Sequence, residues 1–198
     1  MPTIGSGQKA ALLEAYNAAV SLLPTSLRAE FLVIGGTSLV ILGSGRKTED
    51  VDFAVSGAAL HAFEEASSTD PRFAKGVVAD WTYTCKGKGI EDLKVALEFL
   101  QMGGAFAPKI SAIKPAGGGF RASMGELLRM KGKTYLAREM TGDLDDFRFL
   151  LKKMEETGEE FEGVELEEED VESMKETAAA CGGRSSELLK KLLRKAGL

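Results

Sequence analysis

The architecture of this protein follows from one stretch, FLVIGGTSLVILGSGRKTEDVDFAV, residues 31–55. Its first four residues are apolar and predict a short buried strand. Gly35 and Gly36 follow, and an apolar run at residues 39–42 then predicts a helix. Glycines between a strand and a helix let backbone N–H groups approach an anion closely, and the helix N-terminus adds partial positive charge. The stretch therefore predicts a strand, a turn that contacts an anion, and a helix.

A second strand is predicted at the end of the same stretch, after a polar loop at residues 43–49. Successive side chains of a strand point to opposite faces, so Asp50 and Asp52 share one face and Val51 and Phe53 the other. Two like charges so close together repel, and a divalent cation is the usual relief. Mg²⁺ prefers such oxygen ligands together with substrate phosphates. The alternative interpretation is a surface turn followed by an edge strand with two solvated aspartates.

Together, the two halves resemble the signature of the polymerase-beta-like nucleotidyltransferase superfamily. That signature is an apolar residue, Gly, then Gly or Ser, a gap, and an acid–apolar–acid triplet. Here Ile34-Gly35-Gly36 is separated by thirteen residues from Asp50-Val51-Asp52. The resemblance implies an α+β fold, with a small mixed β-sheet, helices packed on it, and a C-terminal helical half. It also implies transfer of an NMP unit from a nucleoside triphosphate, with Mg²⁺ (or Mn²⁺) as cofactor.

A third acid is expected to complete the metal site, because the resembling family carries one on a later strand. Residues 93–100, LKVALEFL, predict that strand, and Glu98 stands between Leu97 and Phe99 in a segment otherwise suited to burial. A buried carboxylate is costly unless it is paired or bound to a metal. Glu98 is therefore the predicted third ligand, with Glu91 and Asp92 as alternatives. Glu98 on a water-exposed sheet face, with no metal role, is the competing interpretation.

Length and composition limit the possible classes of protein. A chain of 198 residues with 44% hydrophobic content supports one domain, or a domain with an appendage. We predict a nucleotidyltransferase core at residues 1–120 and a helical region packed on it at residues 121–198. No apolar run approaches the length of a membrane span. Two distant cysteines and one histidine argue against a zinc site and predict a cytoplasmic protein with reduced thiols.

The remaining elements are predicted from periodicity and turn signals. Helices are expected at residues 8–23, which Pro24 ends, and at residues 57–66. Strands are expected at residues 76–79 and 81–85, after a loop at residues 67–73. The glycine- and proline-rich residues 101–119 predict loops around one short strand.

The helical half is predicted to start at Ser123, which forms a capping box with Glu126. This half resembles the abortive-infection-type toxin branch of the superfamily. In that branch a helix carries a Leu-Leu-x-x-Lys pattern, an Arg follows, and a helix then opens with Asp-Leu-x-Asp. The matching positions are residues 127–131, Arg138 and residues 143–147, and residues 46–50 match the branch's Arg-x-Thr-x-Asp loop. The resemblance implies a toxin-like, NTP-binding enzyme.

Roles for these residues follow from the resemblance and from phosphate chemistry. Asp50, Asp52 and Glu98 would be the catalytic metal ligands. The substrate-binding positions are predicted to contact or neutralise the triphosphate, or to orient the residues that do so. They are Gly35, Gly36, Thr37, Ser38, Arg46, Lys131, Arg138 and Asp146.

A helix–helix salt bridge without a catalytic role is the competing interpretation for Lys131, Arg138, Asp143 and Asp146. We expect Lys131→Ala to weaken triphosphate binding while leaving the fold nearly intact. The acceptor is left open between RNA such as tRNA, a protein and a small molecule, and the nucleotide and the oligomeric state are not specified. The other function class is a catalytically reduced, nucleotide-binding regulatory or partner module.

The C-terminal segment has a distinct charge pattern. Residues 155–172 are strongly acidic, whereas residues 184–195 are basic with a leucine stripe, and Ser185 or Ser186 could cap a helix there. One interpretation is a basic amphipathic element that contacts RNA, a membrane or a partner protein. The other is a terminal helix that packs its leucines on the body and pairs its cations with the acidic run.

Overall fold

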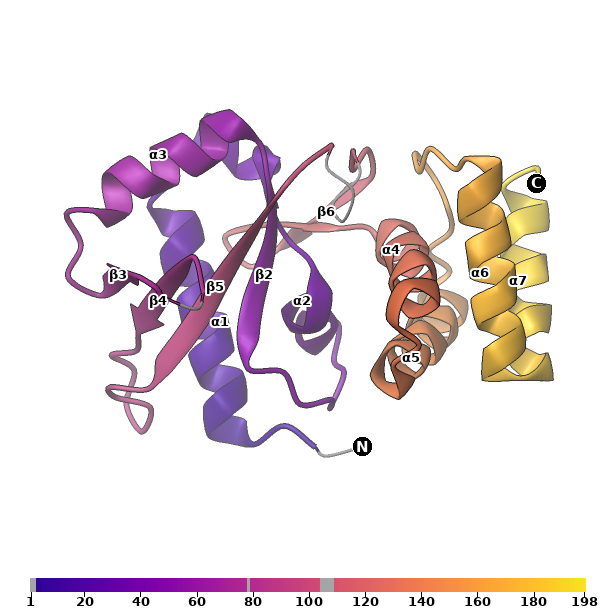
Figure 1. Cartoon of the computed structure of the whole chain (residues 1–198), viewed down its shortest axis with the longest axis horizontal. Coiled ribbons are helices and arrows are strands. Elements are labelled where there is room, and N and C mark those ends of the chain that lie inside the picture. Colours follow the sequence, from indigo (N-terminus) through magenta and orange to yellow (C-terminus); the bar gives the residue numbers. More distant parts are fainter. Residues whose placement is uncertain (1–2, 78, 104–108) are drawn as a thin grey trace. The chain divides into compact units, whose positions relative to one another are not determined.

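The computed structural model describes residues 3–77, 79–103 and 109–198 (Figure 1). The chain divides into two compact units. The first comprises Met1–Lys109 and Ile113–Arg121, and the second comprises Ile110–Ala112 and Ala122–Leu198. Within the described ranges, no helix is both long and apolar enough to cross a membrane. The predicted boundary between residues 120 and 121 stays a prediction about independent domains.

Strands that the described residues form in the first unit join into one mixed sheet of seven, in the order β3-β4-β5-β2-β1-β7-β6. β1 pairs antiparallel with β2 and parallel with β7, while β2 pairs parallel with β5. β4 pairs antiparallel with β3 and with β5. The strands are β1 (Phe31–Val33), β2 (Asp50–Val55), β3 (Phe73–Lys75), β4 (Trp81–Thr84), β5 (Lys94–Gln101), β6 (Ile113–Ala116) and β7 (Gly119–Ala122).

Helices α1 (Ser6–Ser21), α2 (Gly35–Ile41) and α3 (Gly57–Ser67) accompany this sheet, with a 3-10 turn at Thr25–Glu30. The hydrophobic core contains residues of α1 and α3 and one face of β2 and β5. Val51, Phe53 and Leu97 are fully buried on that face. Because strand side chains alternate, the residues between them point to the opposite face of the sheet. The core therefore leaves Asp50, Asp52 and Glu98 on one shared face.

The second unit is built from four helices in its described residues, α4 (Met124–Arg138), α5 (Thr141–Thr157), α6 (Glu168–Cys181) and α7 (Gly183–Lys195). Leu128, Phe147, Leu150, Met154 and Met174 are fully buried within it. Figure 1 shows α6 and α7 side by side, and the two helices are in contact. The apolar residues recur three and four positions apart, so they lie on one face of each helix, and these faces pack together as the core of this unit.

The structure confirms the predicted fold class and places the predicted strands of the signature in one sheet. Residues 76–79 were expected as a strand, but residues 76, 77 and 79 form none, and residue 78 lies outside the described residues. Gly76 donates its N–H to the carbonyl of Asp80 at 3.1 Å, which closes the turn between β3 and β4. Residues 101–119 were expected to hold one short strand, and β6 is the one strand that lies wholly within the described part of this segment, which otherwise holds only the last residue of β5 and the first residue of β7. Helix α6 was not predicted, because its acidic start hides the buried positions Met174 and Ala178.

The predicted cap of α4 is confirmed in part, and the predicted serine cap of α7 is wrong. Ser123 does cap α4, since its Oγ accepts the Glu126 N–H at 3.2 Å. The reciprocal half of the capping box is absent, because the Ser123 N–H bonds to the Ala112 carbonyl at 2.8 Å. The Glu126 carboxylate instead accepts the Ser111 and Ala112 N–H groups. At the other end of the unit, α7 begins after Gly182 and neither predicted serine caps it.

Candidate metal and nucleotide site

Three carboxylates converge on the face of the sheet that points away from the core. β2 and β5 run parallel, and their register sets Asp52 opposite Glu98. Asp50 lies two residues before Asp52 on the same strand face. One carboxylate oxygen from each of the three residues lies within 4.8 Å of the other two. The strand register thus brings residues far apart in sequence to one point.

This arrangement fits a divalent cation. Mg²⁺ binds oxygen ligands at about 2.0–2.1 Å, so two oxygens on opposite sides of one ion lie about 4.2 Å apart. The observed spread of up to 4.8 Å needs only a small side-chain movement to reach that separation. Asp50 and Glu98 form no ion pair with any residue in the described part of the chain. Their negative charge is therefore available to an external cation.

Glu98 is exposed, which corrects the expectation that its own carboxylate is buried. Its neighbours Leu97 and Val95 are buried because they alternate with it and point into the core. Partial desolvation and the negative charges of Asp50 and Asp80 raise the pKa of Glu98 above its ordinary value. The alternative interpretation, in which Glu98 lies on a water-exposed face of the sheet, is correct about the location of Glu98. The same face also carries Asp50 and Asp52.

Asp80 is a nearby acid that sequence reasoning missed. It ends the turn before β4, and its Oδ2 accepts the Phe99 N–H at 2.7 Å. This bond joins Asp80 to β5 directly beside Glu98. A single aspartate before an aromatic strand carries no pattern that marks such a role, and only the antiparallel pairing of β4 with β5 reveals it.

Gly35 and Gly36 make the close approaches that the signature predicts. Gly35 has a φ of +59°, and a Cβ built there would lie 1.8 Å from Oδ2 of Asp52. A Cβ at Gly36 would lie 2.4 Å from Oγ1 of Thr48. Neither position can hold a side chain without moving one of these neighbours. The glycine turn therefore lies directly against the acidic strand and the loop before it.

The hydroxyl groups around this turn are occupied within the fold. Thr37 Oγ1 donates to the Asp50 carbonyl at 2.6 Å, and Ser38 Oγ donates to the Gly35 carbonyl at 2.7 Å. Both residues are fully buried. Thr48, which had no predicted role, donates its Oγ1 to Oδ1 of Asp50 at 2.9 Å. Thr48 thus orients one of the candidate metal ligands, and its place in the Arg-x-Thr-x-Asp loop was the signal available.

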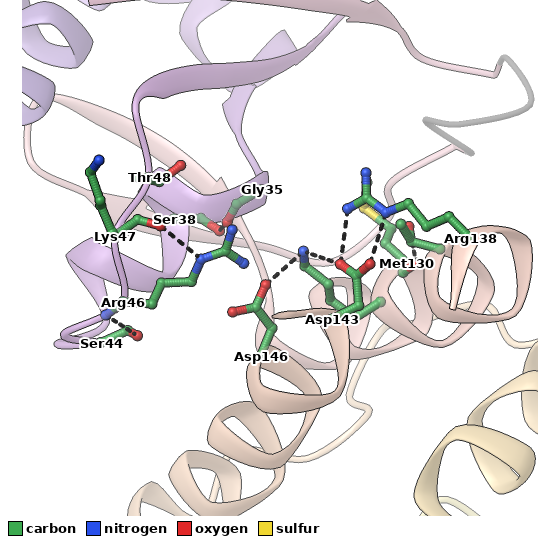
Figure 2. A network of polar contacts seen from close by, with 12 residues as sticks. Gly35, Ser38, Ser44, Arg46, Lys47, Thr48, Met130, Arg138, Asp143 and Asp146 are labelled. Carbon is green, nitrogen blue, oxygen red and sulfur yellow. Dashed lines mark hydrogen bonds and ion pairs between the residues drawn. The ribbon is translucent and has the colours of Figure 1, made fainter. Parts of the chain in front are cut away.

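Arg46 lies in the loop between α2 and β2 and is half-buried. Its Nε donates to the Lys47 carbonyl at 3.4 Å, and its N–H bonds to Ser44 Oγ at 3.2 Å (Figure 2). These contacts hold the loop that leads into Asp50. The predicted contact of Arg46 with phosphate remains a prediction.

The other predicted residues form a buried ion-pair network within the helical unit. Lys131 Nζ on α4 lies 3.0 Å from Oδ1 of Asp143 and 2.7 Å from Oδ2 of Asp146 on α5. Both aspartates are 1% exposed. Figure 2 shows Arg138 and Asp143 facing each other, and Arg138 Nε lies 2.8 Å from Oδ2 of Asp143. The network joins α4 to α5.

Electrostatics in this network favour the ionised aspartate. Burial alone would raise the pKa of Asp143, but the Arg138 hydrogen bond and the charge of Lys131 outweigh it and hold the pKa below its ordinary value. Lys131 is therefore a structural cation whatever else it does. The expectation that Lys131→Ala leaves the fold nearly intact stays a prediction, and it must be weighed against the loss of the cation that Asp143 and Asp146 share.

Comparisons with known proteins find the fold but no sequence relative. No family model matches the chain, and no curated protein matches it. A crystal structure of an antigenic nucleotidyltransferase-like protein from Paracoccidioides brasiliensis is similar at a TM-score of 0.66 and 15% identity, covering 96% of this chain and 95% of that chain. JHP933 from Helicobacter pylori is similar at a TM-score of 0.56 and 18% identity, covering 97% and 96%. The chain thus has the fold of a nucleotidyltransferase-like protein.

Proposed function

We propose that this protein is a metal-dependent nucleotidyltransferase that moves an NMP unit from a nucleoside triphosphate to an acceptor. The observation that carries the proposal is the convergence of Asp50, Asp52 and Glu98, with Gly35 packed against Asp52. The nucleotidyltransferase-like fold supports it. The resemblance to the toxin branch rests on the sequence motifs alone.

In the proposed reaction an acceptor oxygen attacks the α-phosphorus of the triphosphate. The bond from that phosphorus to the bridging oxygen breaks, pyrophosphate leaves, and the acceptor proton passes to solvent. A Mg²⁺ or Mn²⁺ ion held by the three carboxylates would neutralise charge on the phosphate oxygens. The fold orients the carboxylates that would hold the ion, and the hydrogen bond from Thr48 Oγ1 orients the carboxylate of Asp50.

The proposed triphosphate contacts come from the backbone of the glycine turn. Backbone N–H groups of Gly35 and Gly36 are the proposed anion contacts because neither residue carries a side chain of its own. The buried hydroxyls of Thr37 and Ser38 already donate within the fold, so the proposal assigns them to holding the turn. Arg46, Lys131 and Arg138 are proposed to neutralise phosphates, with Asp146 orienting Lys131.

The test compares two Asp→Asn variants of the first unit. Asp52→Asn removes a proposed ligand, whereas Asp92→Asn is a matched control at an exposed acid whose side chain is 85% accessible. Mn²⁺ binding is measured by electron paramagnetic resonance, and transfer is measured with each α-³²P-labelled triphosphate against a cell extract. We expect Asp52→Asn to weaken Mn²⁺ binding at least tenfold and to abolish labelling, with an unchanged or higher melting temperature in EDTA.

Each other outcome has a defined meaning. Mn²⁺ and triphosphate binding without labelling of any acceptor would favour the catalytically reduced, nucleotide-binding module. Equal Mn²⁺ binding by the parent and Asp52→Asn would contradict the metal site. Equal losses in Asp52→Asn and Asp92→Asn would show that general negative charge, rather than this cluster, attracts the ion.

A further inference from the structure

Gln8 lies in the first turn of α1, but its side chain bonds outside that helix. Its Nε2 donates to the carbonyl of Thr48, which comes 40 residues later in the chain. Helix α1 is itself fixed in place, because its buried residues, among them Leu12 and Tyr16, belong to the hydrophobic core. Gln8 therefore ties the loop before β2 to an element that the core holds rigid.

The same loop is attached to the residues just before α1. Ile4 donates its N–H to the Gly45 carbonyl at 2.8 Å. Thr3 forms an isolated antiparallel bridge with Arg46. These two contacts hold the backbone at the middle of the loop, whereas the Gln8 bond holds its end, where the chain enters β2. The N-terminal part of the first unit thus fixes this loop at more than one point.

Thr48 carries this constraint to a candidate metal ligand. Its side chain is buried, and its Oγ1 donates to Oδ1 of Asp50 at 2.9 Å. The same Oγ1 would lie 2.4 Å from a Cβ built on Gly36, so Thr48 fills the space between the glycine turn and β2. The direction of its hydroxyl depends on where its backbone lies, and the bond from Gln8 fixes that backbone. Two hydrogen bonds in series therefore run from Gln8 through Thr48 to Asp50.

A neutral carboxamide suits this position. The NH₂ group of Gln8 can donate to a carbonyl without carrying a charge. A glutamate carboxylate could not donate to that carbonyl, and a lysine would add a positive charge near the carboxylates that are proposed to hold the ion. Glutamine thus fixes the loop and leaves the charge of the cluster unchanged.

We infer that Gln8 is a positioning residue for the proposed metal site and acts through Thr48 on the carboxylate of Asp50. This role rests on the proposed function. Partners that orient a metal ligand influence affinity although they do not contact the ion. Because Gln8 acts through the Thr48 hydroxyl, its effect on cation affinity should not exceed the effect of removing that hydroxyl.

The experiment compares two Gln→Met variants. Gln8→Met keeps the length of the side chain and removes the donor. Gln101→Met is the matched control, because Gln101 is exposed at the end of β5. Gln8→Met is also combined with Thr48→Val and, separately, with Thr48→Ser, which keeps the hydroxyl. Electron paramagnetic resonance measures Mn²⁺ affinity from the signal of the free ion and ligand symmetry from the spectrum of the bound ion.

We expect Gln8→Met to weaken Mn²⁺ binding by about threefold to tenfold and Gln101→Met to weaken it by less than about twofold. In the Thr48→Val protein, Gln8→Met should add less than about twofold, because the bond through which it acts is already gone. In the Thr48→Ser protein it should keep its effect. The spectrum of bound Mn²⁺ should change in the same way in Gln8→Met and Thr48→Val, which a general loss of stability would not produce.

Two results would overturn the positioning role. Equal losses of affinity in Gln8→Met and Gln101→Met would show that the substitution, rather than the bond to Thr48, is the cause. A full additional loss when Gln8→Met is combined with Thr48→Val would show that Gln8 does not act through the Thr48 hydroxyl.

Hydrogen exchange in EDTA tests the bond without a metal. The amides of residues 43–49 should exchange about tenfold faster in Gln8→Met than in Gln101→Met. Unchanged exchange would overturn the bond itself. Equal Mn²⁺ affinity of the parent and Gln8→Met would keep the proposed metal site and remove the role of Gln8. A parent that binds no Mn²⁺, with faster loop exchange in Gln8→Met, would remove the proposed function and leave Gln8 as a structural attachment of the loop.

Discussion

Each unit of this protein gathers carboxylates, and the two clusters are held in opposite ways. On the sheet, Asp50 and Glu98 form no ion pair in the described chain, and negative neighbours together with desolvation raise the pKa of Glu98. In the helical unit, Asp143 and Asp146 are 1% exposed and share Lys131. There the balance is reversed, and the pKa of Asp143 lies below its ordinary value.

The carboxylates on the sheet are proposed to bind an external cation, whereas the carboxylates of the helical unit are neutralised by Lys131 within the fold. A buried carboxylate must be neutralised within the fold, because water does not reach it. A carboxylate cluster at the surface can remain charged in water, at the cost of repulsion that a bound ion removes. Similar acid-rich sequence patterns thus serve stability in one unit and are proposed to serve metal binding in the other.

The largest expected effect is on the internally paired cluster. Lys131→Ala should lower the free energy of unfolding by about 3–5 kcal/mol, because it leaves buried aspartates without their shared cation. Chemical denaturation followed by far-ultraviolet circular dichroism measures the change. Lys152→Ala, which removes an exposed pair with Glu156, should cost less than about 0.5 kcal/mol. Similar costs for the two substitutions would show that the buried network contributes little.

The second prediction concerns the close packing of Gly35 against Asp52 in the carboxylate cluster on the sheet. Gly35→Ala should cost about 2–3 kcal/mol, because it strains a positive φ and drives a methyl group into Asp52. Gly43→Ala is the control, since it also has a positive φ but has no neighbour within 4 Å of the added carbon. It should cost about 1 kcal/mol. Only Gly35→Ala should weaken Mn²⁺ binding; equal weakening by both would refute the contact with Asp52.

Lowering the pH should change the stability of the protein in opposite directions through the two carboxylate clusters. The pKa of Asp143 is lowered in the fold, so its stabilising effect is complete above the unfolded value of about 4 and is lost as the pH falls through the folded value. The pKa of Glu98 is raised, so acidification through that value relieves repulsion and stabilises the metal-free protein. Protonation of Asp143 or Glu98 should change the free energy of unfolding less than Lys131→Ala does, because protonation leaves every side chain in place.

Melting temperatures measured in EDTA from neutral pH downward test this contrast. Asp143→Asn should destabilise the protein at neutral pH and approach the parent at low pH. Glu98→Gln should stabilise it slightly at neutral pH, by a few tenths of a kcal/mol because the site is exposed, and converge with the parent when Glu98 is protonated. The same pH trend in both variants would contradict the assigned electrostatics.

The smallest effect concerns the orientation of one ligand. Thr48→Val removes the hydroxyl that donates to Asp50 while preserving shape, and it should cost about 1 kcal/mol of stability. Metal affinity should fall by about tenfold, the lower end of such effects on ligand orientation. Calorimetric Mn²⁺ titration measures it, with Thr48→Ser as the control that keeps the hydroxyl. If Thr48→Ser loses as much affinity as Thr48→Val, the hydrogen bond is not the cause.

Local sequence patterns determined the signature unit because its constraints are local. Alternation set the two faces of β2, and the paired glycines marked the turn against Asp52. The apolar spacing of α4 and α5 was likewise sufficient to predict both helices. The same logic failed at residues 76–79 and at α6, where short or charged segments carry little periodic signal. Glu98 was predicted as the third metal ligand from the family resemblance, because no local sequence pattern connects it to β2.

Only the tertiary structure decided which charged groups meet. The parallel register of β2 and β5 sets Asp52 opposite Glu98, and the pairing of β4 with β5 adds Asp80. Burial of Asp143 and Asp146 makes Lys131 the cation that pairs with both of them, while its proposed phosphate contact rests on the sequence motif. Burial and distance depend on segments far apart in the chain. The sequence therefore determined the candidate residues, whereas packing decided which of their charges the fold neutralises and which it leaves for a ligand.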